Sequence, residues 1–324
     1  MRRLLPVLIH VLSISLIISQ DYPKKKFYKR EKHAAKIMGR DDRKYGDHSG
    51  NRVLCRFYNH GSIGDQSSSF SGVYPIGSGH SYIWEFSPVV AASVVDTNGF
   101  RRHIVSDGIS GLVDASPEGT PWSFEPLSGY SNPNQENLAM SDNKESWPNS
   151  WPNRTEDWNG EWNGQYGKYV RADQESYFVV DDRYNSEFEF WPDQNDIPEN
   201  PTVSPDEHRR GLGIEMEARG YQWNHPAAED IIIVTYWITN VGSSVLDSVV
   251  FGMYGDADIG GASSFSDDDA WFDTENDMVY QWDHDNWSSS YGGFRPAYFG
   301  WSFLESPGNP HDGIDNDEAN KIYP

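Results

Sequence analysis

A period-two alternation of apolar and polar residues is the feature that most constrains the fold of this chain. In the stretch 211–219, every second residue from Leu212 to Ala218 is apolar, and the positions between carry glycine or charge. This pattern predicts a strand with one buried face. The stretch 231–239 is apolar on both faces and rich in β-branched residues, so we expect a central strand there.

The remaining strands follow from shorter patterns. The stretch 245–254 predicts the strand after 231–239, and because the turn 240–244 separates them we expect an antiparallel pair. Further strand candidates are 81–86, 89–95, 176–180, 278–282 and 297–304. With 29 Gly and 19 Pro in the gaps and no long helical pattern, the sequence predicts an all-β fold. We expect an antiparallel β-sandwich with long Pro/Trp/Asn-rich and Asp-rich loops.

The stretch 115–165 differs from the rest in composition. It is rich in Pro, Asn, Gly, Ser and Trp. A polar linker does not normally carry so many Trp residues, so we expect a long ordered loop excursion that packs across the sandwich.

The N-terminus predicts export. Residues 1–3 supply positive charge, and residues 4–18 form an apolar run that is too short to span a bilayer comfortably. This pattern is typical of a signal peptide, which we place at 1–20; an uncleaved membrane anchor is the alternative. No later apolar run approaches ~20 residues, so we expect no transmembrane segment after cleavage. The protein is then expected to be secreted or held at the outer cell surface.

Charge divides the mature chain in two. Residues 22–56 carry twelve Lys/Arg, whereas the chain from Phe57 onward carries 44 Asp/Glu against twelve Lys/Arg. We expect a basic flexible segment at 21–52 and an acidic sandwich body at 53–324. An acidic body repels phosphate, which excludes nucleic acid as a partner. Cys55 is the single cysteine, so stability must come from packing or from metal rather than from disulfides.

The acidic loops predict a cation. Calcium takes six to eight oxygen ligands from carboxylates and carbonyls on bendable loops, and it offsets self-repulsion. A solvated acidic surface is the alternative. The stretch 312–318 resembles part of an EF-hand loop, without its glycine and distal Glu. The candidate Ca²⁺ ligands are Asp256, Asp258, Asp267, Asp268, Asp269, Asp273, Asp277, Asp312, Asp315 and Asp317.

The Trp residues admit a second hypothesis. In a polar, Asn/Gly-rich context an indole face can stack on a sugar ring while Asn binds hydroxyls. The alternative is that these side chains pin the long loop to the sandwich. The candidate carbohydrate-binding residues are Trp147, Trp151, Trp158 and Trp162. Trp237, Trp282 and Trp301 lie in strand patterns and are expected in the core.

Catalytic patterns are weak. The chain has no Gly-x-Ser-x-Gly elbow, no His-Glu-x-x-His zinc motif and no phosphate-binding Gly-rich loop. The stretch 283–285 is Asp-His-Asp. Because adjacent residues of a strand point to opposite faces of the sheet, we expect His284 to be a surface histidine. We assign no catalytic residue.

Several longer stretches together resemble a known group of sequences. They are Trp147-Pro148, Trp151-Pro152, Asn163–Gly167, Ala172–Tyr177, Arg209–Gly213, Gly220–Trp223, Asp256–Gly261, Phe303–Pro310 and Asp312–Asp317. Over roughly residues 57–324 the chain resembles the uncharacterised large secreted proteins of Bacteroidota, Ignavibacteria and related marine bacteria. The resemblance implies a β-rich secreted or surface protein and no particular activity. Members often carry a C-terminal sorting domain; this chain stops at Pro324 without one, which suggests a truncated product.

Three functional hypotheses follow. The first is a secreted or cell-surface Ca²⁺-binding β-sandwich protein with a structural or adhesion role. The second is a carbohydrate-binding module, with surface glycans or cell-envelope proteins as partners. The third, a glycan- or peptide-active hydrolase, is permitted by the many carboxylates but specified by none of them.

Overall fold

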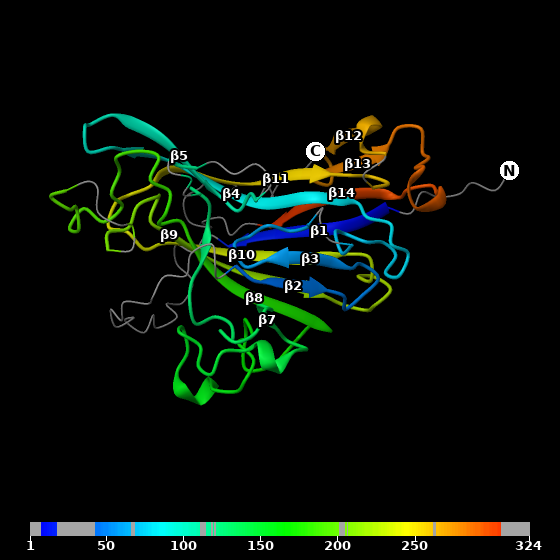
Figure 1. The fold of residues 1–324 in the computed structure, drawn as a ribbon, viewed down its shortest axis with the longest axis horizontal. Coiled ribbons are helices and arrows are strands. Elements are labelled where there is room, and N and C mark those ends of the chain that lie inside the picture. The colour runs from blue at the N-terminus through cyan, green and yellow to red at the C-terminus, as the bar shows by residue number, and fades with distance from the viewer. Residues whose placement is uncertain are drawn as a thin grey trace, which may run out of the picture.

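The regular structure of the chain is almost wholly β. The computed structural model describes residues 8–17, 43–65, 69–110, 115–117, 119, 121–200, 205, 207–261 and 264–305. Within these ranges the regular elements are β-strands and 3-10 turns of three residues each (Figure 1). The prediction of an all-β fold is confirmed. No helix in these ranges is long and apolar enough to cross a membrane.

A nine-stranded sheet forms the larger layer. Its strands run in the order β12-β13-β14-β1-β10-β9-β8-β6, and β7 also pairs with β8. All neighbours are antiparallel except β1, which is parallel to both β10 and β14. The bounds are β1 Leu8–Ile17, β6 Glu125–Pro126, β7 Ala139–Met140, β8 Gln174–Asp181, β9 Ile214–Gln222, β10 Ile232–Asn240, β12 Asp268–Asp273, β13 Met278–Asp283 and β14 Tyr298–Glu305.

Two smaller units pack against this sheet. One is a three-stranded sheet in the order β11-β4-β5, and the other is the antiparallel hairpin β2-β3 (Figure 1). Phe86 of β4 meets Phe299 and Trp301 of β14 edge-on, at ring-centroid distances of 5.1 and 4.8 Å, so the main core lies between the layers. The bounds are β2 Tyr45–His48, β3 Cys55–Tyr58, β4 Ile83–Val95, β5 Arg101–Asp107, β11 Asp247–Ala257, η2 Lys144–Ser146, η3 Glu156–Trp158, η4 Phe265–Asp267 and η5 Ser290–Gly292.

One predicted strand pairing is wrong. The strand expected at 245–254 forms as β11, but it pairs with β4 in the smaller sheet and not with β10. The turn after β10 explains the crossing. Val241 N donates to Gly213 O, and Ser243 N donates to Pro192 O, so the turn is bonded to neighbouring loops and directs the chain to the other layer.

Two predicted strands form one. The candidates 81–86 and 89–95 join in the single strand β4, although Pro88 lies between them. Pro88 has no N–H to donate, and pairing with β5 starts only at Val89. The proline therefore sits where it interrupts no bond of the β4-β5 ladder.

The predicted signal peptide contributes a strand. Leu8–Ile17 forms β1, with Leu12 opposite Ile232 of β10 and Leu8 opposite Tyr298 of β14. An apolar, β-branched segment suits a position between two strands. Its removal by a signal peptidase stays a prediction.

The excursion at 115–165 builds a second core. Trp151 and Trp162 are each 2 % exposed and pack with Tyr177 and Val179 of β8. The Trp-rich composition thus corresponds to packing on the outer face of β8, with the short strands β6 and β7 attached to the same strand.

Candidate metal site in the acidic loops

Three carboxylates converge at one end of the β12-β13 hairpin. Asp267 ends η4, Asp283 ends β13, and Asp285 follows two residues later. Each offers one carboxylate oxygen, and these three oxygens lie within 4.8 Å of one another. We call Asp267, Asp283 and Asp285, with the adjoining Asp258 and Asp268, the acidic cluster.

The loop after β11 brings Asp258 to the cluster and is held in place by its glycines. Gly260 and Gly261 have φ of 83° and 85°, which L side chains rarely adopt. A Cβ on Gly260 would lie 2.7 Å from the Ser288 side chain, whose hydroxyl donates to Gly260 O at 2.7 Å. The sequence Asp-Ile-Gly-Gly thus forms a tight turn beside β13 rather than a loose acidic loop.

Asp283 is the most buried of the three converging residues, at 3 % exposed. Its Oδ2 accepts from the Ser264 hydroxyl at 2.8 Å, and its Oδ1 accepts from Trp287 N at 2.7 Å. These bonds fix the orientation of the carboxylate, and a carboxylate oxygen has lone pairs left for a further partner.

Asp268 has one bonded and one unmatched carboxylate oxygen. Its Oδ2 accepts from Ile259 N at 2.8 Å. Its Oδ1 is buried and has no hydrogen-bond partner among the described residues. A buried, unmatched carboxylate oxygen costs free energy unless a donor, a proton or a cation approaches it.

The electrostatics of the cluster are unfavourable without a positive charge. The pKa of Asp268 is raised from 3.8 to about 7, chiefly by burial. The hydrogen bond from Ile259 N lowers this pKa, and the charges of Asp283, Asp258 and Asp267 raise it. In the described ranges, Asp267, Asp268, Asp283 and Asp285 form no ion pair with Lys or Arg. The group therefore favours a bound proton or a metal ion.

The donor set is that of a hard cation. Calcium binds oxygen ligands at 2.3–2.6 Å, so two ligands on opposite sides of one ion lie at most about 5 Å apart. The 4.8 Å limit on the three oxygens fits that span. Cysteine and histidine take no part in the group, which disfavours zinc.

The predicted ligands divide into several groups. Asp258, Asp267 and Asp268 belong to the acidic cluster. Asp269 lies beside it and is hydrogen-bonded to His284 Nδ1 at 2.7 Å. Asp256 sits opposite Glu85 in the β4-β11 ladder, where burial raises its pKa.

The other predicted ligands lie away from the cluster. Asp273 and Asp277 flank the turn at the far end of the hairpin, five residue steps or roughly 17 Å along the strand from Asp268. At that turn Asp273 caps Glu275 N and Asn276 N. Asp312, Asp315 and Asp317 lie outside the described residues.

Two cluster residues were missed by the sequence reasoning. Asp283 is the last residue of β13, and Asp285 lies in the bend that follows it. The period-two pattern of the strand ends at Asp283, so it does not predict that the two carboxylates converge. The register that places Asp283 opposite Asp268 was not predicted.

The four predicted sugar-binding Trp residues belong to the second core or its rim. Trp151 and Trp162 are buried, and Trp147 and Trp158 pack against them half-buried. Trp147 Nε1 donates to Met140 O, Trp151 Nε1 to Glu161 O, and Trp162 Nε1 to Glu175 Oε2. The indole faces of Trp151 and Trp162 are not offered to a ligand at the surface.

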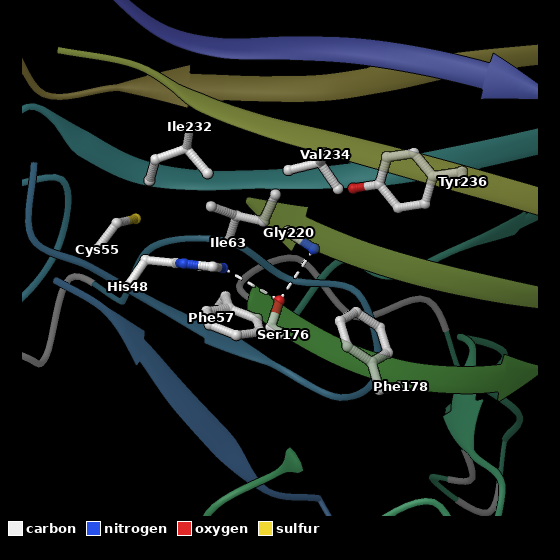
Figure 2. Close-up of a pocket in the computed structure, with 10 residues that line it drawn as sticks. All are labelled: His48, Cys55, Phe57, Ile63, Ser176, Phe178, Gly220, Ile232, Val234 and Tyr236. Carbon is white, nitrogen blue, oxygen red and sulfur yellow. Dashed lines mark hydrogen bonds between the residues drawn. The ribbon is translucent and has the colours of Figure 1, made fainter. Parts of the chain in front are cut away.

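A second candidate is a small cavity between the β2-β3 hairpin and the larger sheet. Figure 2 shows His48 Nε2 pointing at Ser176 Oγ, 3.1 Å away, while Gly220 N donates to the same oxygen at 3.0 Å. Burial lowers the pKa of His48 to about 4 and raises that of Cys55 to about 12, so both side chains are neutral. The cavity holds about 20 Å³, room for one water molecule. We assign this His-Ser pair to docking of the hairpin and not to catalysis.

Comparison with protein-family models, with curated proteins and with solved structures finds no match to this chain.

Proposed function

We propose that the chain is a secreted or cell-surface β-sandwich protein that binds Ca²⁺ at the acidic cluster and has a structural or adhesion role. The observation that carries the proposal is the convergence of Asp267, Asp283 and Asp285 beside the unmatched Oδ1 of Asp268. A divalent ion there would offset the carboxylates of Asp267, Asp268, Asp283 and Asp285, which form no ion pair with Lys or Arg within the described ranges.

The place of the cluster in the fold explains what the ion would do. The acidic cluster joins the loop after β11, which belongs to the smaller sheet, to β12 and β13 of the larger sheet. Ligands from both sheets on one ion would link the two layers at this end of the sandwich. Export, expected from the N-terminal pattern, would place the protein where calcium is abundant.

The first prediction is a calcium-dependent melting temperature. Full-length protein in 1 mM Ca²⁺ should melt at least 5 °C higher than in EDTA, because ligand present at 100 times its Kd stabilises by about 2.7 kcal/mol. The Asp283→Asn/Asp285→Asn double variant should lose that difference. Differential scanning calorimetry measures both.

The matched control is Asp277→Asn. Asp277 is exposed, lies at the opposite end of the same hairpin and has a φ of 45°, which Asn tolerates. It should keep the full calcium response. Equal melting temperatures of the unmodified protein in Ca²⁺ and EDTA would refute the proposal, and so would an equal loss of response in the control.

A further inference from the structure

The outer face of the β12-β13-β14 sheet carries a row of aromatic rings. Trp271 of β12 lies opposite Tyr280 of β13, and Trp282 of β13 lies two residues further along, on the same face. Tyr298 of β14 stacks on Trp282 at 5.8 Å and contacts Tyr280 at 6.1 Å. We call Trp271, Tyr280, Trp282 and Tyr298 the aromatic platform.

The platform is on the side of the sheet away from the core. Successive strand residues point to opposite faces, and Phe299 and Trp301 of β14 face inward onto Phe86. Tyr298 therefore faces outward. Trp271 is 62 % exposed, and Tyr280, Trp282 and Tyr298 are partly exposed. The prediction that Trp282 lies in the core is wrong, because its ring is partly exposed on the outer face of the sheet.

The polar atoms of the platform are unused. The indole N–H groups of Trp271 and Trp282 and the hydroxyls of Tyr280 and Tyr298 make no hydrogen bond to a described residue. Three of the four Trp residues in the second core have their N–H groups bonded internally. The contrast indicates that the platform rings are available to a ligand, whereas the loop Trp residues are committed to the fold.

A charged pair completes the surface. Asp269, opposite Trp282, pairs with the exposed His284 at 2.7 Å. The surface thus offers flat apolar rings, several free donors and a carboxylate acceptor at one corner.

We propose that the aromatic platform binds an uncharged hexopyranose polysaccharide. A pyranose ring presents an apolar C–H face for stacking, hydroxyl oxygens that accept from the indole N–H groups, and hydroxyl protons that donate to Asp269. Charge favours a neutral glycan, because a chain with a formal net charge of −23 repels uronate and sulfated glycans. The proposal is independent of calcium binding, which uses carboxylates on the other side of the same hairpin.

The second prediction tests the platform by affinity electrophoresis of the full chain in calcium-free buffer, because Ca²⁺ would cross-link the anionic polysaccharides used as controls. The gels contain a soluble neutral polysaccharide, which is a β-glucan, a mannan or a xyloglucan. Parallel gels contain alginate or pectin as anionic controls. We expect retardation by at least one neutral polysaccharide and by neither anionic one. Trp271→Ala and Tyr298→Ala should each weaken the retarding interaction at least tenfold.

Phe272→Ala is the matched control. Phe272 follows Trp271 in β12, is 52 % exposed and lies on the opposite face, so its variant should bind as the unmodified protein does. Absence of retardation by every neutral glycan, an equal loss in the control, or retention of binding by Trp271→Ala would overturn the proposal. So would concentration-dependent dimerisation in sedimentation that Trp271→Ala abolishes, because the face would then join two copies of the chain.

Discussion

At the scale of single residues, Asp268 shows how burial and neighbouring charge act together. Its Oδ2 is used by Ile259 N while its Oδ1 has no partner among the described residues, and three other carboxylates raise its pKa. The sequence identified this residue as a candidate ligand from composition alone. It could not show which oxygen lacks a partner, because that depends on the contact between β12 and the loop after β11.

The third prediction concerns the pH dependence set by Asp268. Its pKa in the folded protein is about 7 and its ordinary value is 3.8. Between these values the folded state binds more protons, so without calcium the free energy of unfolding should fall as pH rises from 4 to 7. Urea titrations in EDTA measure this slope.

Asp268→Asn should flatten that slope and raise stability in EDTA at pH 7, because an amide oxygen still accepts from Ile259 N without adding charge. Saturating Ca²⁺ should also flatten the slope in the unmodified protein. An unchanged slope in the variant would assign the pH dependence to other carboxylates.

At the scale of elements, local pattern predicts strands better than it predicts their partners. The alternation at 211–219 and the apolar run at 231–239 correspond to β9 and β10, which pair as antiparallel neighbours. The destination of β11 depends on loop bonds at Gly213 and Pro192, which no local pattern contains. Local pattern also does not predict that Asp283 belongs to the acidic cluster, because the position of Asp283 beside Asp268 depends on the register of the β12-β13 hairpin.

The fourth prediction concerns the packing of the β2-β3 hairpin against the larger sheet. A Cβ on Gly220 would lie 2.3 Å from His48 Nε2 and 2.7 Å from Ser176 Oγ, so Gly220→Ala must displace the hairpin. We expect a loss of about 1–3 kcal/mol in the free energy of unfolding, measured by urea denaturation.

Gly252→Ala is the control, because Gly252 also lies within a strand and its Cβ would meet nothing within 4 Å. Adding His48→Ala to Gly220→Ala should recover part of the loss by removing the clash. No recovery in the double variant would locate the strain elsewhere.

At the scale of the whole molecule, charge opposes compaction. The formal net charge is −23, and the acidic residues concentrate in the part of the chain that folds as the sandwich. Repulsion between like charges at this density destabilises a compact state. Salt screens this repulsion, because the Debye length falls from about 30 Å at 0.01 M to about 10 Å at 0.1 M ionic strength.

The fifth prediction follows from that repulsion. In EDTA, the melting temperature should rise by several degrees when NaCl is increased from 10 to 500 mM. The rise should be smaller in 1 mM Ca²⁺, because the bound ion has already offset part of the charge. A melting temperature independent of salt in EDTA would show that self-repulsion is not a major destabilising contribution.

The position of β1 has a consequence for biogenesis. β10 and β14 are not bonded to each other; each is bonded to the segment Leu8–Ile17, which lies between them. A protease that excised this segment during export would divide the larger sheet into a β12–β14 part and a β6–β10 part, each with a newly bare edge. Retention of the segment would instead make the predicted signal peptide a permanent component of the folded product. N-terminal sequencing of the mature protein therefore reports whether cleavage opens this sheet or whether the sheet stays intact.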